Sequence, residues 1–113
     1  MTKTTDEIIY ELRKQSASIN KLCKEAYEIT KSKGFYDSPR ETGTVLALIH
    51  SEVSEALEAD RKGDTEGFIE ELADICIRVF TLCGEIGIDL DQAIRDKMEK
   101  NKKREYKHGG KAY

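Results

Sequence analysis

Apolar residues recur at a helical period in four stretches of the 113-residue chain, separated by polar or glycine-containing connections. This pattern predicts helices over residues 5–31, 44–61 and 66–85, followed by a fourth that begins at Asp89 and frays before His108. The first helix has one apolar face, whereas the third is apolar on most sides. A helix of the latter kind lies at the centre of a bundle or in a subunit interface.

Breaks in the pattern coincide with residues that favour turns. Residues 34–39 contain the only proline and are predicted to form a loop that exposes two adjacent aromatic residues, Phe35 and Tyr36. Gly63 and Asp64 are predicted to reverse the chain between the second and third helices, with Asp64 or the next residue capping the third. The two middle helices should therefore form a hairpin.

The sequence also predicts where the third helix ends and where the fourth begins. Gly84 and Gly87 are expected to close the third helix. Asp89 and Gln92 have the spacing of a capping box, in which each side chain bonds a free backbone amide at the helix start. One proline, no tryptophan and abundant helix-forming residues disfavour a sheet. We therefore expect one domain over residues 1–113, all-α and of the four-helix bundle type.

Composition and cysteine content predict whether the chain self-associates and in which redox environment it works. Charged residues make up 36% of the chain and hydrophobic residues 38%, so the core is thin and self-association is favoured. Three cysteines, an odd number in a chain without a signal peptide, indicate a reduced, cytoplasmic environment rather than a disulfide framework. No apolar run approaches the roughly 18 to 20 residues needed to span a membrane.

Charge is distributed unevenly along the chain. The net charge of -3 gives no overall attraction to nucleic acid or to anionic membranes. Residues 52–74 nevertheless hold nine acidic side chains against two basic ones, and residues 95–111 hold eight Lys or Arg. An acidic centre that binds metal and a basic tail that binds an anion could cooperate on a phosphate ligand. Two solvated helix faces account for the same pattern equally well.

Two acidic pairs lie at matched distances on either side of Gly63. Glu55 precedes it by eight residues and Glu71 follows it by eight, while Glu52 and Asp74 each stand eleven residues away. At a rise of about 1.5 Å per residue, a hairpin closed at Gly63 brings the four carboxylates level with one another. Such a cluster repels itself unless it holds a cation, and oxygen ligands suit Mg²⁺, with Mn²⁺ as a substitute.

Two other interpretations of the acids have to be weighed. Asp74 could form a salt bridge with Arg78 one turn later, leaving the other acids simply exposed. A ferritin-like di-iron site needs Glu-x-x-His on facing helices, and the two acidic helices lack that motif. The matched heights of the two pairs favour a metal site over the salt bridge, and the all-oxygen ligands favour Mg²⁺ over iron.

The predicted fourth helix offers a possible phosphate-binding face. Lys97, Asn101 and Arg104 recur at spacings of four and three and so share one side of the helix. The guanidinium of Arg104 could bind a phosphate through two nitrogens. A solvated face fits the spacing equally well. A glycine-rich phosphate loop and a Gly-x-Ser-x-Gly motif are both lacking, so nothing supports nucleophilic side-chain catalysis.

The pattern Glu52-x-x-Glu55, a gap, and Glu71-x-x-Asp74 resembles that of the MazG-type all-α nucleoside triphosphate pyrophosphohydrolases. The likeness covers most of the chain, because residues 97–110 are similar to the family's C-terminal segment. Its aromatic loop also has a counterpart in residues 34–37, although the chain carries Phe-Tyr there in place of the expected tryptophan.

This resemblance implies Mg²⁺-dependent hydrolysis of a nucleoside triphosphate to the monophosphate and pyrophosphate, as in housecleaning of the nucleotide pool. It also implies a homo-oligomer, either a dimer or a tetramer. The residues it assigns are Glu52, Glu55, Glu71 and Asp74 for metal binding and catalysis, Lys97, Asn101 and Arg104 for phosphate contacts, and Phe35 or Tyr36 for stacking on the base.

Other functions stay open at this stage. Relatives of similar shape act on the deoxyuridine nucleotides dUTP and dUDP or on phosphoribosyl-ATP, and the residues named above suit these substrates too. The chain could instead be a non-catalytic helical module that binds a protein partner or nucleic acid through its basic segment. The negative net charge makes nucleic acid the weaker of those two partners.

Overall fold

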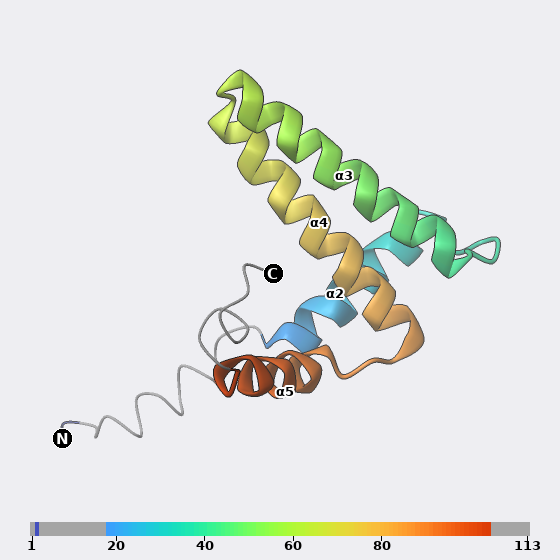
Figure 1. Ribbon diagram of the computed structural model, residues 1–113. Coiled ribbons are helices and arrows are strands. Elements are labelled where there is room, and N and C mark those ends of the chain that lie inside the picture. Colours follow the sequence, from blue (N-terminus) through green and yellow to red (C-terminus); the bar gives the residue numbers. More distant parts are fainter. Residues whose placement is uncertain (1, 3–17, 105–113) are drawn as a thin grey trace.

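The computed structural model describes residue 2 and residues 18–104, and this part of the chain is helical without any strand. Four helices follow one another with short connections (Figure 1). They are α2 (Ile19–Ser32), α3 (Thr42–Lys62), α4 (Thr65–Ile86) and α5 (Leu90–Lys102). The predicted all-α class is confirmed, and none of the described helices is long and apolar enough to cross a membrane.

The turn at Gly63 joins α3 and α4 into the predicted antiparallel hairpin (Figure 1). Gly63 has a φ of 71°, in the left-handed region that glycine reaches without steric cost. Asp64 then caps α4, because its side-chain Oδ1 accepts a hydrogen bond of 3.0 Å from the backbone N–H of Gly67. These two adjacent residues fix how the faces of α3 and α4 meet.

Gly84 lies inside α4, where α2 packs closest against it, and does not end the helix. A Cβ at this position would collide with the carbonyl oxygen of Cys23 and lie 2.8 Å from Cβ of Tyr27. The expectation that Gly84 closes the helix was therefore wrong, because this glycine is required by packing rather than by a turn. Gly87, with a φ of 75°, provides the C-cap.

The first predicted helix does not run without a break through residue 18. Ser18 has extended backbone angles, and its hydroxyl accepts a hydrogen bond from the N–H of Lys21, so a helix begins at Ile19. The predicted single helix over 5–31 is interrupted at that point, and the rest of the prediction, residues 5–17, lies outside the described residues.

The connection to α5 is tied to α2. Asp89 accepts a hydrogen bond from the N–H of Gln92 at 3.1 Å, as a capping residue should. The reciprocal bond of the predicted capping box is not made, because the Gln92 side chain donates to Asp96 instead. Asp89 also accepts a hydrogen bond of 2.8 Å from the side chain of Asn20. This contact holds the start of α5 against the start of α2.

The core of the described residues is small. Its buried apolar members are Cys23, Val45, Ala56, Ala59 and Cys83, and within the described ranges no large side chain is fully buried. Apolar residues remain exposed along α3, at Leu46, Val53 and Leu57, and we call this stripe the α3 apolar face. Its spacings of seven and four place the three on one side of the helix.

Candidate active site

Three of the four predicted carboxylates meet between α3 and α4. Glu52, Glu55 and Glu71 each offer an oxygen, and these oxygens lie within 4.8 Å of one another. Glu52 is buried, with only 8% of its surface exposed, whereas Glu71 is half-buried and Glu55 is exposed. We call these three residues the carboxylate triad. The hairpin register predicted from Gly63 brings this triad together.

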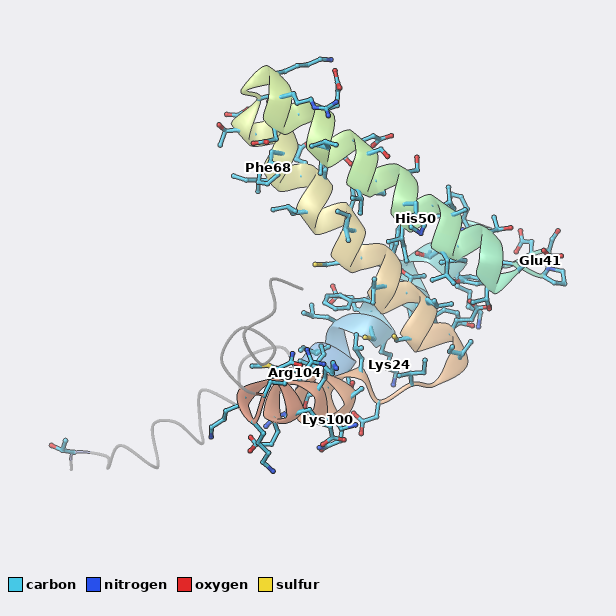
Figure 2. The ribbon with its side chains drawn as sticks, viewed as in Figure 1. Lys24, Glu41, His50, Phe68, Lys100 and Arg104 are labelled. Carbon is cyan, nitrogen blue, oxygen red and sulfur yellow. The ribbon has the colours of Figure 1, made fainter. Side chains whose placement is uncertain are left out.

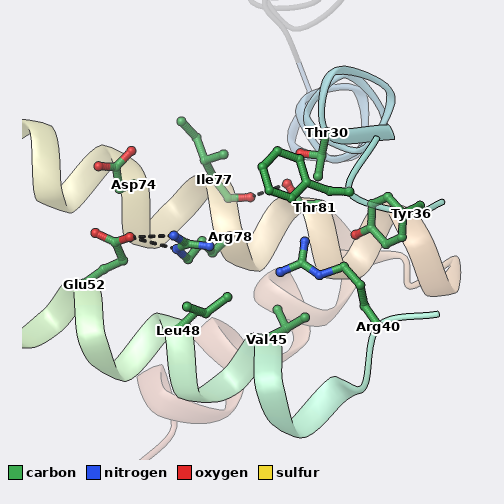
Figure 3. A pocket seen from close by; sticks show the side chains of 11 residues that line it. Thr30, Tyr36, Arg40, Val45, Leu48, Glu52, Asp74, Ile77, Arg78 and Thr81 are labelled. Carbon is green, nitrogen blue, oxygen red and sulfur yellow. Dashed lines mark hydrogen bonds and ion pairs between the residues drawn. The ribbon is translucent and has the colours of Figure 1, made fainter. Parts of the chain in front are cut away.

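Arg78 of α4 holds the buried member of the triad. Its Nε and Nη2 both contact Oε1 of Glu52, at 2.9 and 2.8 Å (Figure 3). The nearby Glu71 carboxyl and this guanidinium together hold the pKa of Glu52 below its usual range. The alternative salt bridge between Asp74 and Arg78 is not formed among the described residues, because the guanidinium reaches across to α3.

Glu71 carries the opposite perturbation. The adjacent Glu52 carboxylate, together with burial and Glu55, raises the pKa of Glu71 to about 7. Its Oε2 is buried and has no hydrogen-bond partner in the described part of the protein. A buried carboxylate oxygen without a partner is costly, and a divalent cation bound by the three oxygens would satisfy it. The triad therefore fits a hard divalent metal.

Asp74, the fourth predicted acid, lies one turn beyond Glu71 on α4 and outside the triad. It is exposed and lines a cavity of about 460 Å³ that Glu52 also lines (Figure 3). Glu52 thus belongs to both the triad and the cavity. The lining residues are Thr30, Phe35, Tyr36, Arg40, Val45, Leu48, Glu52, Asp74, Ile77, Arg78 and Thr81.

The loop between α2 and α3 forms the other end of this cavity. Phe35 is 60% exposed, as predicted, whereas Tyr36 packs edge-on against Tyr27 with ring centroids 5.2 Å apart. The hydroxyl of Tyr36 is buried without a hydrogen-bond partner. Burial and the nearby Glu85 carboxylate raise the pKa of that hydroxyl. Arg40 lies over both rings, 5.8 Å from the centroid of Phe35 and 5.6 Å from that of Tyr36.

A profile of the MazG-like family matches residues 47–112, which is more than half of the chain. The chain belongs to the MazG-like family. A search of curated proteins finds no match, and a search of solved structures finds none either. The matched region includes the triad and Asp74, whereas the aromatic loop precedes it.

The basic residues predicted to contact phosphate lie elsewhere in this MazG-like chain. Lys97, Asn101 and Arg104 are on or just beyond α5, which packs against α2, and none of them lines the cavity or joins the triad. Figure 2 shows Arg104 well apart from His50, which marks α3 two residues before Glu52. Within one copy, these residues and the acids are not brought together.

Two functional candidates were missed by sequence reasoning. Arg40 follows the loop proline at no diagnostic spacing, so nothing in the pattern singles it out. Arg78 was considered only as a neighbour of Asp74, because spacing within a helix reveals partners on that helix alone. Its true partner, Glu52, lies on the facing helix. The partner of Arg78 and the position of Arg40 in the cavity both depend on how the helices pack.

Proposed function

We propose that this MazG-like chain is a Mg²⁺-dependent nucleoside triphosphate pyrophosphohydrolase that acts on free nucleotides in the cytoplasm. It would cleave between the α and β phosphates to give a monophosphate and pyrophosphate. The observation that carries this proposal is the carboxylate triad with its unpartnered Glu71 oxygen, placed beside a cavity of about 460 Å³. That volume lies within the range of small-molecule sites.

The triad is assigned to metal binding, with Mg²⁺ as the expected ion and Mn²⁺ as a substitute. A divalent cation bound there would neutralise the negative charge that develops on the phosphate oxygens during hydrolysis. Arg78 keeps Glu52 charged and fixes the orientation of its carboxylate. Glu71 must give up its proton before it can act as a ligand, and because its pKa is raised to about 7 it does so only near neutral pH.

Asp74 is assigned to the attacking water, because it is the carboxylate that lies outside the triad yet lines the cavity with Glu52. The water oxygen forms a bond to phosphorus, and the bond from that phosphorus to the bridging oxygen breaks. Asp74 accepts the proton that the water loses. The electron pair of the broken bond stays on the bridging oxygen, which departs with the leaving group.

Lys97, Asn101 and Arg104 remain our proposed phosphate contacts, and they require a second copy of the chain. Because α5 of one copy does not reach its own triad, the α5 of a neighbouring copy would supply them. The exposed α3 apolar face and the small core support a homo-oligomer, a dimer or a tetramer. The basic face and the acidic site would then meet across a subunit interface.

Release of pyrophosphate from a nucleotide panel tests the activity. The panel includes the common ribo- and deoxynucleoside triphosphates, dUTP and phosphoribosyl-ATP, together with dUDP, whose cleavage is followed through release of phosphate, and each is tested with Mg²⁺ and with a chelator. The expected result is metal-dependent hydrolysis of at least one member; no turnover of any would overturn the proposal. Binding to a protein or nucleic acid that survives chelation, with no hydrolysis, would instead support a non-catalytic helical module.

Two variants separate the assigned roles. Glu71→Gln removes a charged ligand at nearly constant shape, so Mg²⁺ binding measured by titration calorimetry should weaken together with turnover. Asp74→Asn should retain Mg²⁺ binding while turnover falls by at least about a hundredfold, the usual contribution of a positioned base. If Asp74→Asn hydrolyses nucleotides at the wild-type rate, the base assignment fails.

A further inference from the structure

Arg40 occupies an unusual position at the end of the cavity farthest from the acids. It is half-buried in the loop before α3, stacked over Phe35 and Tyr36 at 5.8 and 5.6 Å. Figure 3 shows its side chain extending from the loop into the cavity, on the side facing Arg78 and Glu52. Contact with two aromatic rings restricts where the guanidinium can lie.

Among the described residues, the hydrogen-bonding capacity of Arg40 is unused. A guanidinium has five N–H donors and no acceptor, and within residues 18–104 that of Arg40 makes no ion pair or hydrogen bond. The adjacent Tyr36 hydroxyl is buried and lies near the Glu85 carboxylate, so the donors open to a ligand here are those of Arg40. This end of the cavity therefore offers fixed donors that lack acceptors. A ligand that presents acceptor atoms would satisfy them.

The length of the cavity bears on which part of a nucleotide reaches Arg40. Thr42, two residues after Arg40, lies about 15 Å along the α3 axis from Glu52. Phosphates held at the triad leave the ribose and base to extend along the cavity toward the aromatic loop. Arg40 is thus placed to meet the edge of the base, while Phe35 and Tyr36 supply apolar surface beside it.

We propose that Arg40 is a specificity-determining residue that selects 6-oxopurine nucleotides, those of guanine and hypoxanthine. The fork of a guanidinium matches the adjacent O6 and N7 acceptors of a 6-oxopurine. Adenine presents an amino donor at the same position, which would face the donors of Arg40. This proposal rests on the proposed pyrophosphohydrolase activity and names the base that the same site takes.

The test compares kcat/KM for GTP, ITP and ATP in the wild-type protein, Arg40→Gln and Arg40→Ala. The wild type should prefer GTP and ITP over ATP by about tenfold or more, the discrimination expected of one bidentate pair. Arg40→Ala should remove the preference. Arg40→Gln should reverse it toward ATP, because an amide pairs with the N6 and N7 atoms of adenine. Arg61→Gln, at an exposed position in the last turn of α3, is the matched control and should behave as wild type.

Other results of the same experiment would decide against base selection by Arg40. Equal use of the three nucleotides by the wild type, or a preference retained in Arg40→Gln, overturns the proposal. A uniform loss for all three would mean that Arg40 contacts phosphate, which overturns base selection. If no nucleotide is hydrolysed, the proposed function fails, and calorimetric binding of GMP against AMP then tests Arg40 alone: tighter GMP binding that Arg40→Gln abolishes supports it, and equal binding overturns it.

Discussion

At the level of single residues, Glu71 is the member of the triad whose pKa is raised by its surroundings. Two neighbouring carboxylates and burial hold a proton on it up to about pH 7, and its Oε2 has no partner among the described residues. The same crowding that raises its pKa makes the triad suitable for a cation. A proton and the proposed metal would therefore compete for one carboxylate.

The pH dependence of stability should reveal this competition. The unfolded chain loses the Glu71 proton near 4.5, whereas the folded protein keeps it to about 7. Without metal, stability should therefore fall as pH rises across that window, and Mg²⁺ should reduce the fall. Thermal unfolding from about pH 5 to pH 7.5 measures it, with Glu71→Gln as control. The same slope in the variant and the wild type would contradict the assignment.

The pair formed by Arg78 and Glu52 should contribute measurably to folding. Arg78→Met leaves the Glu52 carboxylate buried without its donors, and hydrogen bonds to a charged group are worth about 1.5 to 3 kcal/mol. Urea denaturation should show a loss of that size. Arg95→Met, which removes an exposed pair with Asp91, should change stability by less than about 1 kcal/mol. Equal losses in the two variants would argue against a special role for Arg78.

At the level of whole helices, the contact between α2 and α4 depends on Gly84. Gly84→Ala places a methyl group against the backbone of Cys23 and should cost about 1 to 3 kcal/mol, as overpacking does. Gly43→Ala, in the first turn of α3 with open space around it, should instead be neutral or stabilising by up to about 1 kcal/mol. Chemical denaturation measures the free energy of unfolding of both variants. If Gly84→Ala is as stable as the wild type, α2 and α4 can move apart to accept the methyl group.

The sequence predicted local elements better than contacts between them. Gly63 and Asp64 predict the hairpin from sequence because turn formation and helix capping depend on only a few neighbouring residues. The register of the triad follows from that hairpin. Gly84 was misread because a glycine in a turn and a glycine under a neighbouring helix look alike in sequence. Arg78 was paired with the wrong acid because its partner lies on another helix. Arg40 was missed because its position in the loop has no diagnostic spacing, and its place in the cavity depends on how α3 and α4 pack.

At the level of the whole molecule, the described chain leaves apolar surface that one copy does not cover. Leu57 is 50% exposed on the α3 apolar face, so Leu57→Glu should shift the protein toward the monomer through the cost of burying a charge. Analytical ultracentrifugation measures this mass change. Lys62→Glu is the control, because it also introduces a glutamate at an exposed position of α3. It should leave the mass unaltered. A wild-type protein that is already monomeric would contradict the proposed oligomer.

The separation of Arg40 from the acids has a consequence for how such proteins diversify. The triad and Asp74 are carried on two long helices whose register one turn sets, whereas Arg40 lies in the connection between α2 and α3. Loop positions accept substitution more readily than helix faces that pack together. If the proposed roles hold, substitutions in this loop would change the base preference while the proposed hydrolytic site on α3 and α4 is inherited unchanged.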